Sequence, residues 1–229
     1  MSTFPDAPLL GQPIGHEIVV VDIEGNGQQP PDIVEIAVLP MTGGRPVTPA
    51  GLRTWLIRPP RPITGLVTRK VHGISNDDVA HAPPWTDVAD QVATAITGRV
   101  MVAHNASVER RVLSAHLPDW YPPLVLDTFR LAKRVWSDLP GGYGLDNLIV
   151  HAHLTSPHFD RADSHGDGAG AGRSELRRHR AAYDTWMTAA LLAALARDSG
   201  LDWDQLCDAA RLPAPRAPRS SGAGREGLW

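Results

Sequence analysis

The amino-acid sequence predicts an α/β fold, in which a mixed sheet of five strands is flanked by helices. In the first third of the chain, strand-like apolar segments follow one another at short intervals, which is typical of an antiparallel meander. Further along, strand-like and helical segments alternate, which favours a mixed sheet covered by helices. The 229 residues, 42% of them hydrophobic, suit one domain with a sizeable core.

Three strands are expected before residue 61. The first begins with the apolar run Ile18–Val21, inside the segment EIVVVDIEGNG at 17–27. The second, DIVEIAVLPM at 32–41, is expected to end at Pro40, because proline lacks the N–H group that a central strand donates. The third, GLRTWLIRPP at 51–60, is closed by its own prolines.

The later elements are expected to alternate between helix and strand. In chain order they are a short helix after Thr64 with a turn around His72 and Gly73, a helix over about Thr86–Ile96, a strand over 99–105, a helix over Ser107–Leu117, a strand closing at 125–128 with a helix to about Val135, and a long helix over about Arg180–Arg197.

The folded domain is expected to span residues 17–212. Residues 1–16 are expected to form an N-terminal extension, and 155–178 a polar, Gly-rich loop inside the domain. Residues 213–229 are rich in Pro, Gly, Ser and Arg, so we expect a disordered tail.

The composition excludes several classes of protein. A formal net charge of −3 gives no general affinity for nucleic acids or membranes, so any polyanion site must be local. Cys207 is the only cysteine, which excludes an internal disulfide and a zinc site built on several thiolates. The first residues lack the basic start and apolar core of a signal peptide, and no apolar run is long enough to cross a bilayer. We therefore expect a cytoplasmic protein without a membrane partner.

Two carboxylates follow the apolar run of the first strand. Asp22 and Glu24 are two positions apart, and residues i and i+2 of a strand point to the same side of the sheet. Their charges repel each other, and both stay ionised at low cost only when a cation lies between them. The sequence therefore predicts a divalent metal site. A strand-end pair that meets solvent or caps a turn is the alternative.

Two further acids are expected to face the sheet. On a helical wheel of 107–117, Glu109 falls inside the apolar arc, and Asp184 shares its face of the final helix with Leu191. His179 precedes Asp184 by five residues, which is about 140° around a continuous helix. It can therefore approach the acids only from the loop before that helix, where a histidine is suited to take a proton from water.

Three motifs in this order resemble those of the DnaQ-like DEDDh 3′–5′ exonucleases of the ribonuclease H-like superfamily. They are VVVDIEG, a strand ending in Asp-x-Glu; VAHNASVERRVL, an Ala-His-Asn turn into a helix that carries an acid; and HRAAYD, a His-x-x-x-x-Asp on the last helix. The segments KVHGISNDDVAHAPPW, LDTFRLAKR and GGYGLDNL also look like their counterparts in the family. The resemblance covers roughly residues 17–198 and implies a ribonuclease H-like mixed five-stranded sheet with helices on both faces.

The resemblance implies a metal-dependent exonuclease that releases nucleoside monophosphates from the 3′ ends of single-stranded DNA or RNA. Two Mg²⁺ or Mn²⁺ ions would bind the scissile phosphate. Asp22 would bridge both ions, Glu24 and Asp184 would complete the first site, and Glu109 would join Asp22 at the second. His179 would be the general base. A polymerase or helicase that binds the proline-rich tail is a further expected partner.

Substrate contact is expected from three loops of the chain. The glycines after the Asp-x-Glu pair leave room for a terminal nucleotide to approach the backbone. The residues assigned to this role are Gly25, Asn26, Gly27, His72, His104 and Asn105. For His104 and Asn105, ordering the turn between strand and helix is the alternative role.

Glu109 departs from the family pattern, which usually has aspartate at this position. Metal sites are sensitive to the extra methylene, so weaker activity or a shift towards manganese is expected. The alternative function is a catalytically weakened exonuclease fold that serves as a nucleic-acid-binding or protein-interaction module. For Glu109, the alternative role is an ion pair with Arg110 or Arg111. For His179, the alternative is an ordinary surface histidine.

Overall fold

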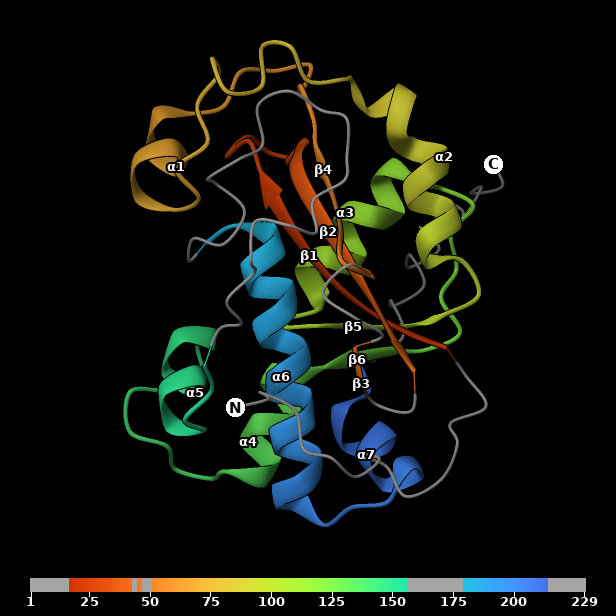
Figure 1. Cartoon of the computed structure of the whole chain (residues 1–229), viewed down its shortest axis with the longest axis vertical. Coiled ribbons are helices and arrows are strands. Elements are labelled where there is room, and N and C mark those ends of the chain that lie inside the picture. The colour runs from red at the N-terminus through yellow and green to blue at the C-terminus, as the bar shows by residue number, and fades with distance from the viewer. Residues whose placement is uncertain (1–16, 43–44, 47–50, 156–178, 214–229) are drawn as a thin grey trace, which may run out of the picture.

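The computed structural model describes residues 17–42, 45–46, 51–155 and 179–213 (Figure 1). The expected N-terminal extension lies outside these residues. So do nearly all of the Gly-rich loop predicted at 155–178 and of the tail predicted at 213–229.

One mixed sheet forms the centre of the fold, and the predicted five-stranded arrangement is confirmed, with a two-residue strand added at one edge. Its order is β3-β2-β1-β5-β6, with β4 also paired to β2. β2 runs antiparallel to β1 and β4, whereas β5 runs parallel to β1 and β6. The strands are β1 (Ile18–Gly25), β2 (Ile33–Thr42), β3 (Arg45–Pro46), β4 (Arg53–Leu56), β5 (Val100–Ala103) and β6 (Val125–Asp127).

The prediction that Pro40 ends the second strand is wrong. β2 continues to Thr42, and Pro40 is the partner of Val19 on β1. On the other side of β2, β4 pairs only as far as Val38, and β3 begins its pairing at Met41. Pro40 thus lies between two short neighbouring strands, a position where a missing N–H group is tolerated.

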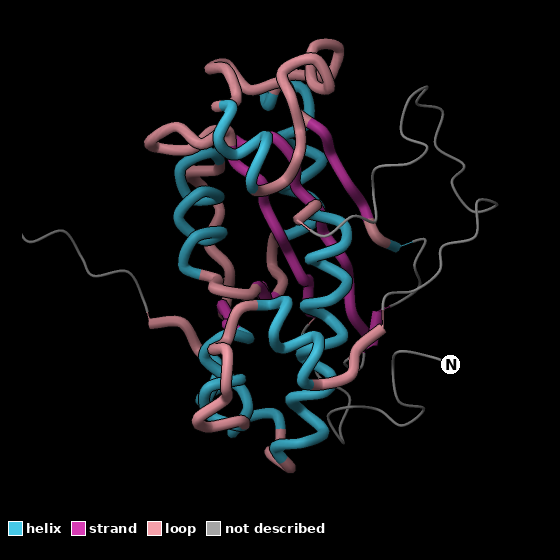
Figure 2. The backbone as a smooth tube through the Cα atoms, turned by 90° about the vertical axis from the view of Figure 1, so that its left-hand side faces the viewer, coloured by secondary structure: helices cyan, strands magenta, loops and turns pink. Residues whose placement is uncertain are grey.

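Helices cover both faces of this sheet, and in Figure 2 they lie on either side of the magenta strands. The helix from Trp203 was not predicted; its capping box joins Asp202 and Gln205, a start signal that the prediction overlooked. The helices are α1 (Gly65–Lys70), α2 (Trp85–Ile96), α3 (Ser107–His116), α4 (Thr128–Val135), α5 (Leu145–His151), α6 (Ala181–Ser199) and α7 (Trp203–Ala210).

The core lies in two layers because side chains of a strand alternate between the faces of the sheet. Ile18 and Val20 of β1 pack in the layer that contains residues of α4, α6 and α7. Val19 and Val21 pack in the opposite layer, with residues of α2 and α3. By the same alternation Asp22 and Glu24 continue the first of these rows, on the side of α6.

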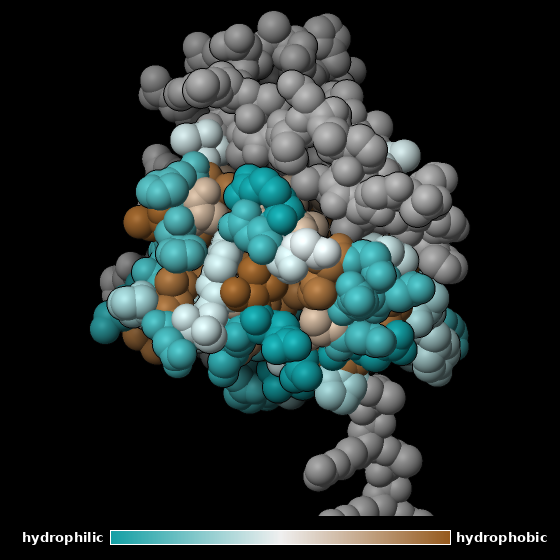
Figure 3. Space-filling view, turned by 90° about the horizontal axis from the view of Figure 1, so that it is seen from below, coloured by the Kyte–Doolittle hydropathy of each residue, from teal (hydrophilic) through white to brown (hydrophobic). Residues whose placement is uncertain are grey.

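The described surface is a mixture of polar and apolar residues. Seen from below, polar areas surround smaller apolar ones (Figure 3), as on most folded proteins. Among the described residues, none of the helices combines the length and the apolar character that crossing a membrane requires.

Candidate metal centre and active site

Three carboxylates meet where β1 ends and α6 begins. Asp22, Glu24 and Asp184 each offer one oxygen, and these oxygens all lie within 4.8 Å of one another. In Figure 1 the carboxyl end of β1 and the first turn of α6 lie close together near the top of the molecule. Strand alternation directs the first two acids toward α6, and Asp184 lies in the first turn of that helix.

This grouping resists ionisation. Burial, followed by the charges of Glu24 and Asp184, raises the pKa of Asp22 well above its ordinary value. Burial and the charge of Asp184 raise the pKa of Glu24 to about 8. Burial raises the pKa of Asp184 to about 6, although the neighbouring His179 lowers it. A cation between the carboxylates would offset both the cost of burying their charges and the repulsion between them. The set of oxygen donors therefore fits a hard divalent ion.

Glu109 approaches from α3, on the other layer of the sheet. It is buried, and its Oε2 has no hydrogen-bond partner among the described residues, so neither neighbouring arginine engages this oxygen. Burial raises its pKa to about 8. Its charge also raises the pKa of Asp22. A buried carboxylate oxygen without a partner is costly, and this fourth acid also fits a role as metal ligand.

His179 lies in the connection directly before α6, with φ of 58°. Its side chain is about half exposed, and Nε2 lies 3.7 Å from Oδ2 of Asp146. Its backbone N–H donates a hydrogen bond to the Asp184 carboxylate. The histidine is therefore joined to the acid cluster through the main chain, while its ring lies near Asp146, a residue that the sequence did not single out.

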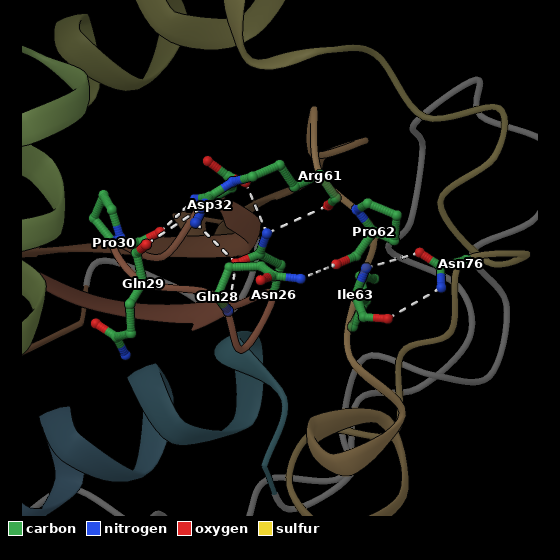
Figure 4. Close-up of polar contacts among 9 residues, drawn as sticks. All are labelled: Asn26, Gln28, Gln29, Pro30, Asp32, Arg61, Pro62, Ile63 and Asn76. Atoms are coloured by element: carbon green, nitrogen blue, oxygen red, sulfur yellow. Dashed lines mark hydrogen bonds and ion pairs between the residues drawn. The ribbon is translucent and has the colours of Figure 1, made fainter.

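Asn26 differs from its expected role, because its side chain is fully buried and unavailable to a substrate. Its Nδ2 donates to Asp32 Oδ2 at 2.7 Å and to the Arg61 carbonyl at 3.3 Å. Its Oδ1 accepts from the backbone N–H groups of Gln28 and Asp32 at 3.1 and 3.0 Å. Figure 4 shows this network closing the loop between β1 and β2. Asn26 shapes the loop, so substrate contact there falls to the backbone on either side.

His72 is also buried, at 4% exposure, which removes it as a direct substrate contact. The Ile74 N–H donates to its Nδ1 at 3.0 Å, so Nε2 carries the proton and donates to the Gly25 carbonyl at 3.1 Å. Burial lowers the pKa of His72, which favours its neutral form. This residue supports the backbone beside the acids.

Gly27 has φ of 76°, and a Cβ atom at this position would lie 2.3 Å from Oγ1 of Thr64. Position 27 requires glycine for two reasons: its backbone is left-handed, and it lies in close contact with the segment before α1. Gly25 and Gly27 remain the candidates for backbone contact with a substrate.

His104 and Asn105 order the turn from β5 into α3. His104 lies between Thr128 Oγ1 and the Tyr143 carbonyl, each 3.0 Å from one ring nitrogen. The Asn105 N–H donates to Asp127 Oδ1 at 2.9 Å, and Asn105 adopts φ of 61°. The Asn105 side chain is exposed, so it remains a candidate for substrate contact.

Sequence reasoning missed a buried ion pair beside the cluster. Glu35 on β2 accepts hydrogen bonds from Arg180, the residue after His179, and from the Ala181 N–H. The two charged side chains are 145 positions apart in sequence. Helical and strand periodicity are local, so neither signals such a pair.

Comparison with known proteins identifies similar chains. Residues 19–192 match the family model RNase_T, described as exonuclease. Exodeoxyribonuclease 10 of Escherichia coli K12 is 30% identical over 199 residues, which are 85% of this chain and 76% of that protein. The 3′-5′ exonuclease DinG of Bacillus subtilis is 30% identical over 167 residues, covering 68% of this chain and 17% of its own length.

Solved structures agree with these sequence matches. Exonuclease X in complex with 5′ overhanging duplex DNA is 31% identical, with a TM-score of 0.62 over 83% of this chain and 98% of that one. A 3′-exonuclease bound to a histone mRNA stem-loop is 14% identical and shares the fold, with a TM-score of 0.60 over 86% of this chain and 66% of its own.

Proposed function

Because this chain belongs to the RNase_T exonuclease family, of the DnaQ-like type, we propose that it is a metal-dependent 3′–5′ exonuclease acting on single-stranded DNA or RNA. The observation that carries the proposal is the meeting of Asp22, Glu24 and Asp184 within 4.8 Å at the carboxyl end of the central strand. Raised pKa values for all three carboxyl groups support a cation as their missing partner.

Asp22, Glu24 and Asp184 would hold one divalent ion, and Glu109 would join Asp22 in holding a second. Mg²⁺ or Mn²⁺ bound there would supply positive charge to the scissile phosphate and make a water molecule more acidic. Oxygen donors alone favour these hard ions over zinc. The orphaned Oε2 of Glu109 supports its inclusion in the ligand set.

His179 would take the proton of the attacking water. The water oxygen would form the new bond to phosphorus as the bond to the 3′ oxygen breaks. The 3′ oxygen of the shortened strand would take up a proton from solvent, and a nucleoside 5′-monophosphate would be released. The half-exposed ring of His179 then returns the proton to solvent. Its left-handed backbone brings its N–H group to the Asp184 carboxylate, which keeps the base beside the acids.

The substrate would enter with its 3′ end beside Gly25 and Gly27. The network of Asn26, Asp32 and Arg61 fixes this loop before substrate arrives, so no ordering is needed on binding. Exonuclease X was solved with duplex DNA carrying a 5′ overhang, in which the 3′ end is recessed. That structure makes DNA the first substrate to test.

A polymerase or helicase partner remains part of the proposal. Truncation after Leu212 removes the proline-rich tail and should abolish co-purification with such a partner while leaving nuclease activity intact. Co-purification that survives truncation would place the contact elsewhere.

The polarity is tested with two versions of one single strand, labelled at either end. From the 5′-labelled strand we expect a ladder of shortening products in Mg²⁺ or Mn²⁺. From the 3′-labelled strand we expect labelled mononucleotide at the earliest times. The reverse pattern would refute the 3′–5′ direction. Tight binding by folded protein without turnover would support the alternative of a weakened, binding-only module.

A further inference from the structure

Glu35 and Arg180 form a buried ion pair at the start of α6. Glu35 is 1% exposed and Arg180 is 8% exposed. Arg180 Nε donates to Glu35 Oε2 at 2.9 Å, and Arg180 Nη2 donates to Oε1, so the guanidinium holds both carboxylate oxygens. Two-point contact of this kind fixes direction as well as distance.

The same carboxylate caps the helix. Glu35 Oε2 also accepts the N–H of Ala181, the first residue of α6, at 2.9 Å. Arg180 is the N-cap residue, and its own side chain makes no capping hydrogen bond. A residue from β2 thus supplies the negative oxygen that a helix start ordinarily takes from the chain just before it.

Glu35 also lies next to the acid cluster on the neighbouring strand. It is the direct partner of Glu24 in the register between β1 and β2. Arg180, at the other end of the ion pair, is bonded to His179 by one peptide link. The ion pair therefore connects β2, the strand paired with the one that carries Asp22 and Glu24, to the residue that follows His179.

His179 is held by the hydrogen bond from its backbone N–H to the Asp184 carboxylate, and its ring is only partly covered by the described residues. Its side chain is about half exposed, and its ring lies 3.7 Å from an oxygen of Asp146, which is itself 46% exposed. Its left-handed backbone conformation is one that L-residues adopt at a cost unless their surroundings impose it. The bidentate contact and the helix cap follow directly after it in the chain.

We propose that Glu35 and Arg180 are positioning residues that fix His179 beside the acid cluster. The inference rests on the proposed role of His179 as general base. Misplacement of a reacting group by about 1 Å costs about 100-fold in rate, so loss of the two-point contact lowers turnover and leaves substrate binding nearly unchanged.

The first test compares Arg180→Lys and Glu35→Gln with the wild type. Lysine keeps the positive charge but cannot form the planar two-point contact. We expect kcat to fall by about 10- to 100-fold and KM for an oligonucleotide to change by less than about two-fold. Arg197→Lys and Glu17→Gln are matched controls in exposed ion pairs, and both should retain wild-type kcat.

A double-mutant cycle with His179→Ala separates positioning from general damage to the fold. If the pair acts through His179, Arg180→Lys has no further effect on kcat once His179 is alanine. If the two losses multiply in the double variant, the positioning role is overturned. An inactive wild type would overturn the proposed function instead, so the two failures are distinguishable.

A structural readout accompanies the kinetics. Replacing both partners, as Glu35→Leu with Arg180→Met, removes the pair without leaving one buried charge alone. We expect this variant to fold cooperatively, to exchange the Ala181 amide hydrogen at least about ten-fold faster, and to lose kcat like Arg180→Lys. Wild-type kcat in this folded variant would overturn the proposal.

Discussion

Glu24 and Glu35 lie directly opposite each other on β1 and β2, yet their charges are balanced in different ways. Glu35 is held by Arg180, whereas Glu24 lies among the acids and its pKa is raised to about 8. Like charges at directly opposite positions of a sheet are destabilising. Arg180 thus balances the charge of Glu35, whereas the proposed divalent ion would balance the charge of Glu24.

Without metal, the stability of the protein should fall as pH rises from about 4.5 to about 8. Glu24 and Glu109 both have a folded-state pKa of about 8, above their ordinary value of 4.5. The folded state thus binds more protons than the unfolded state in this window, and the free energy of unfolding decreases with pH. Mg²⁺ binds the ionised groups, so it should raise the melting temperature more at pH 8 than at pH 6. Thermal unfolding with and without chelator measures this, and an equal metal effect at both pH values contradicts it.

Glu109→Gln should lower kcat by about 10²- to 10³-fold, because it removes one negative charge from the reacting centre and leaves the size of the side chain unchanged. Glu109→Asp is the matched comparison, since it keeps the charge and shortens the side chain by one methylene. We expect it to remain active and to depend less on Mn²⁺. Initial rates in titrations with Mg²⁺ and Mn²⁺ test both variants. Full activity of the glutamine variant would exclude Glu109 from the ligand set.

Asn26→Ala should destabilise the protein by about 1–3 kcal/mol, because partly buried groups of Asp32 and Arg61 lose their hydrogen-bond partner. The loop beside the acids loosens, so KM should rise more than kcat falls. Chemical denaturation and steady-state kinetics measure the two effects. Gln91→Ala serves as control, since it loses only an exposed hydrogen bond to Trp55. Unchanged stability in Asn26→Ala would show that the network does not hold the loop.

Gly27→Ala should be more damaging than Gly142→Ala. Both glycines have positive φ, of 76° and 82°, so alanine meets similar backbone strain at each. A Cβ at Gly142 meets open space, whereas at Gly27 it collides with Thr64. We expect about 1–3 kcal/mol lost at Gly142, and a larger loss with reduced activity at Gly27. Equal losses in urea unfolding would show that the contact with Thr64 relaxes freely.

Local periodicity predicted the frame of this site well. The i, i+2 rule placed Asp22 and Glu24 on one side of β1, and the helical wheel placed Glu109 toward the core, as the structure has them. It could not show that Asn26 is buried, because that depends on Asp32 and Arg61 folding over it. The contact of Glu35 with Arg180 could not be predicted either, because the periodicity of a strand gives no information about which distant residue its side chains contact.

The acid cluster of Asp22, Glu24 and Asp184 is proposed to make this protein a metal-dependent exonuclease. The most direct test is the release of mononucleotides from a 5′-labelled single-stranded DNA by the wild type and by Asp22→Asn, in Mg²⁺, in Mn²⁺ and in chelator. We expect progressive shortening of the strand by the wild type in metal, none in chelator, and a loss of activity of at least about 10³-fold in Asp22→Asn. Shortening that persists in chelator, or in the folded Asp22→Asn variant, would contradict it.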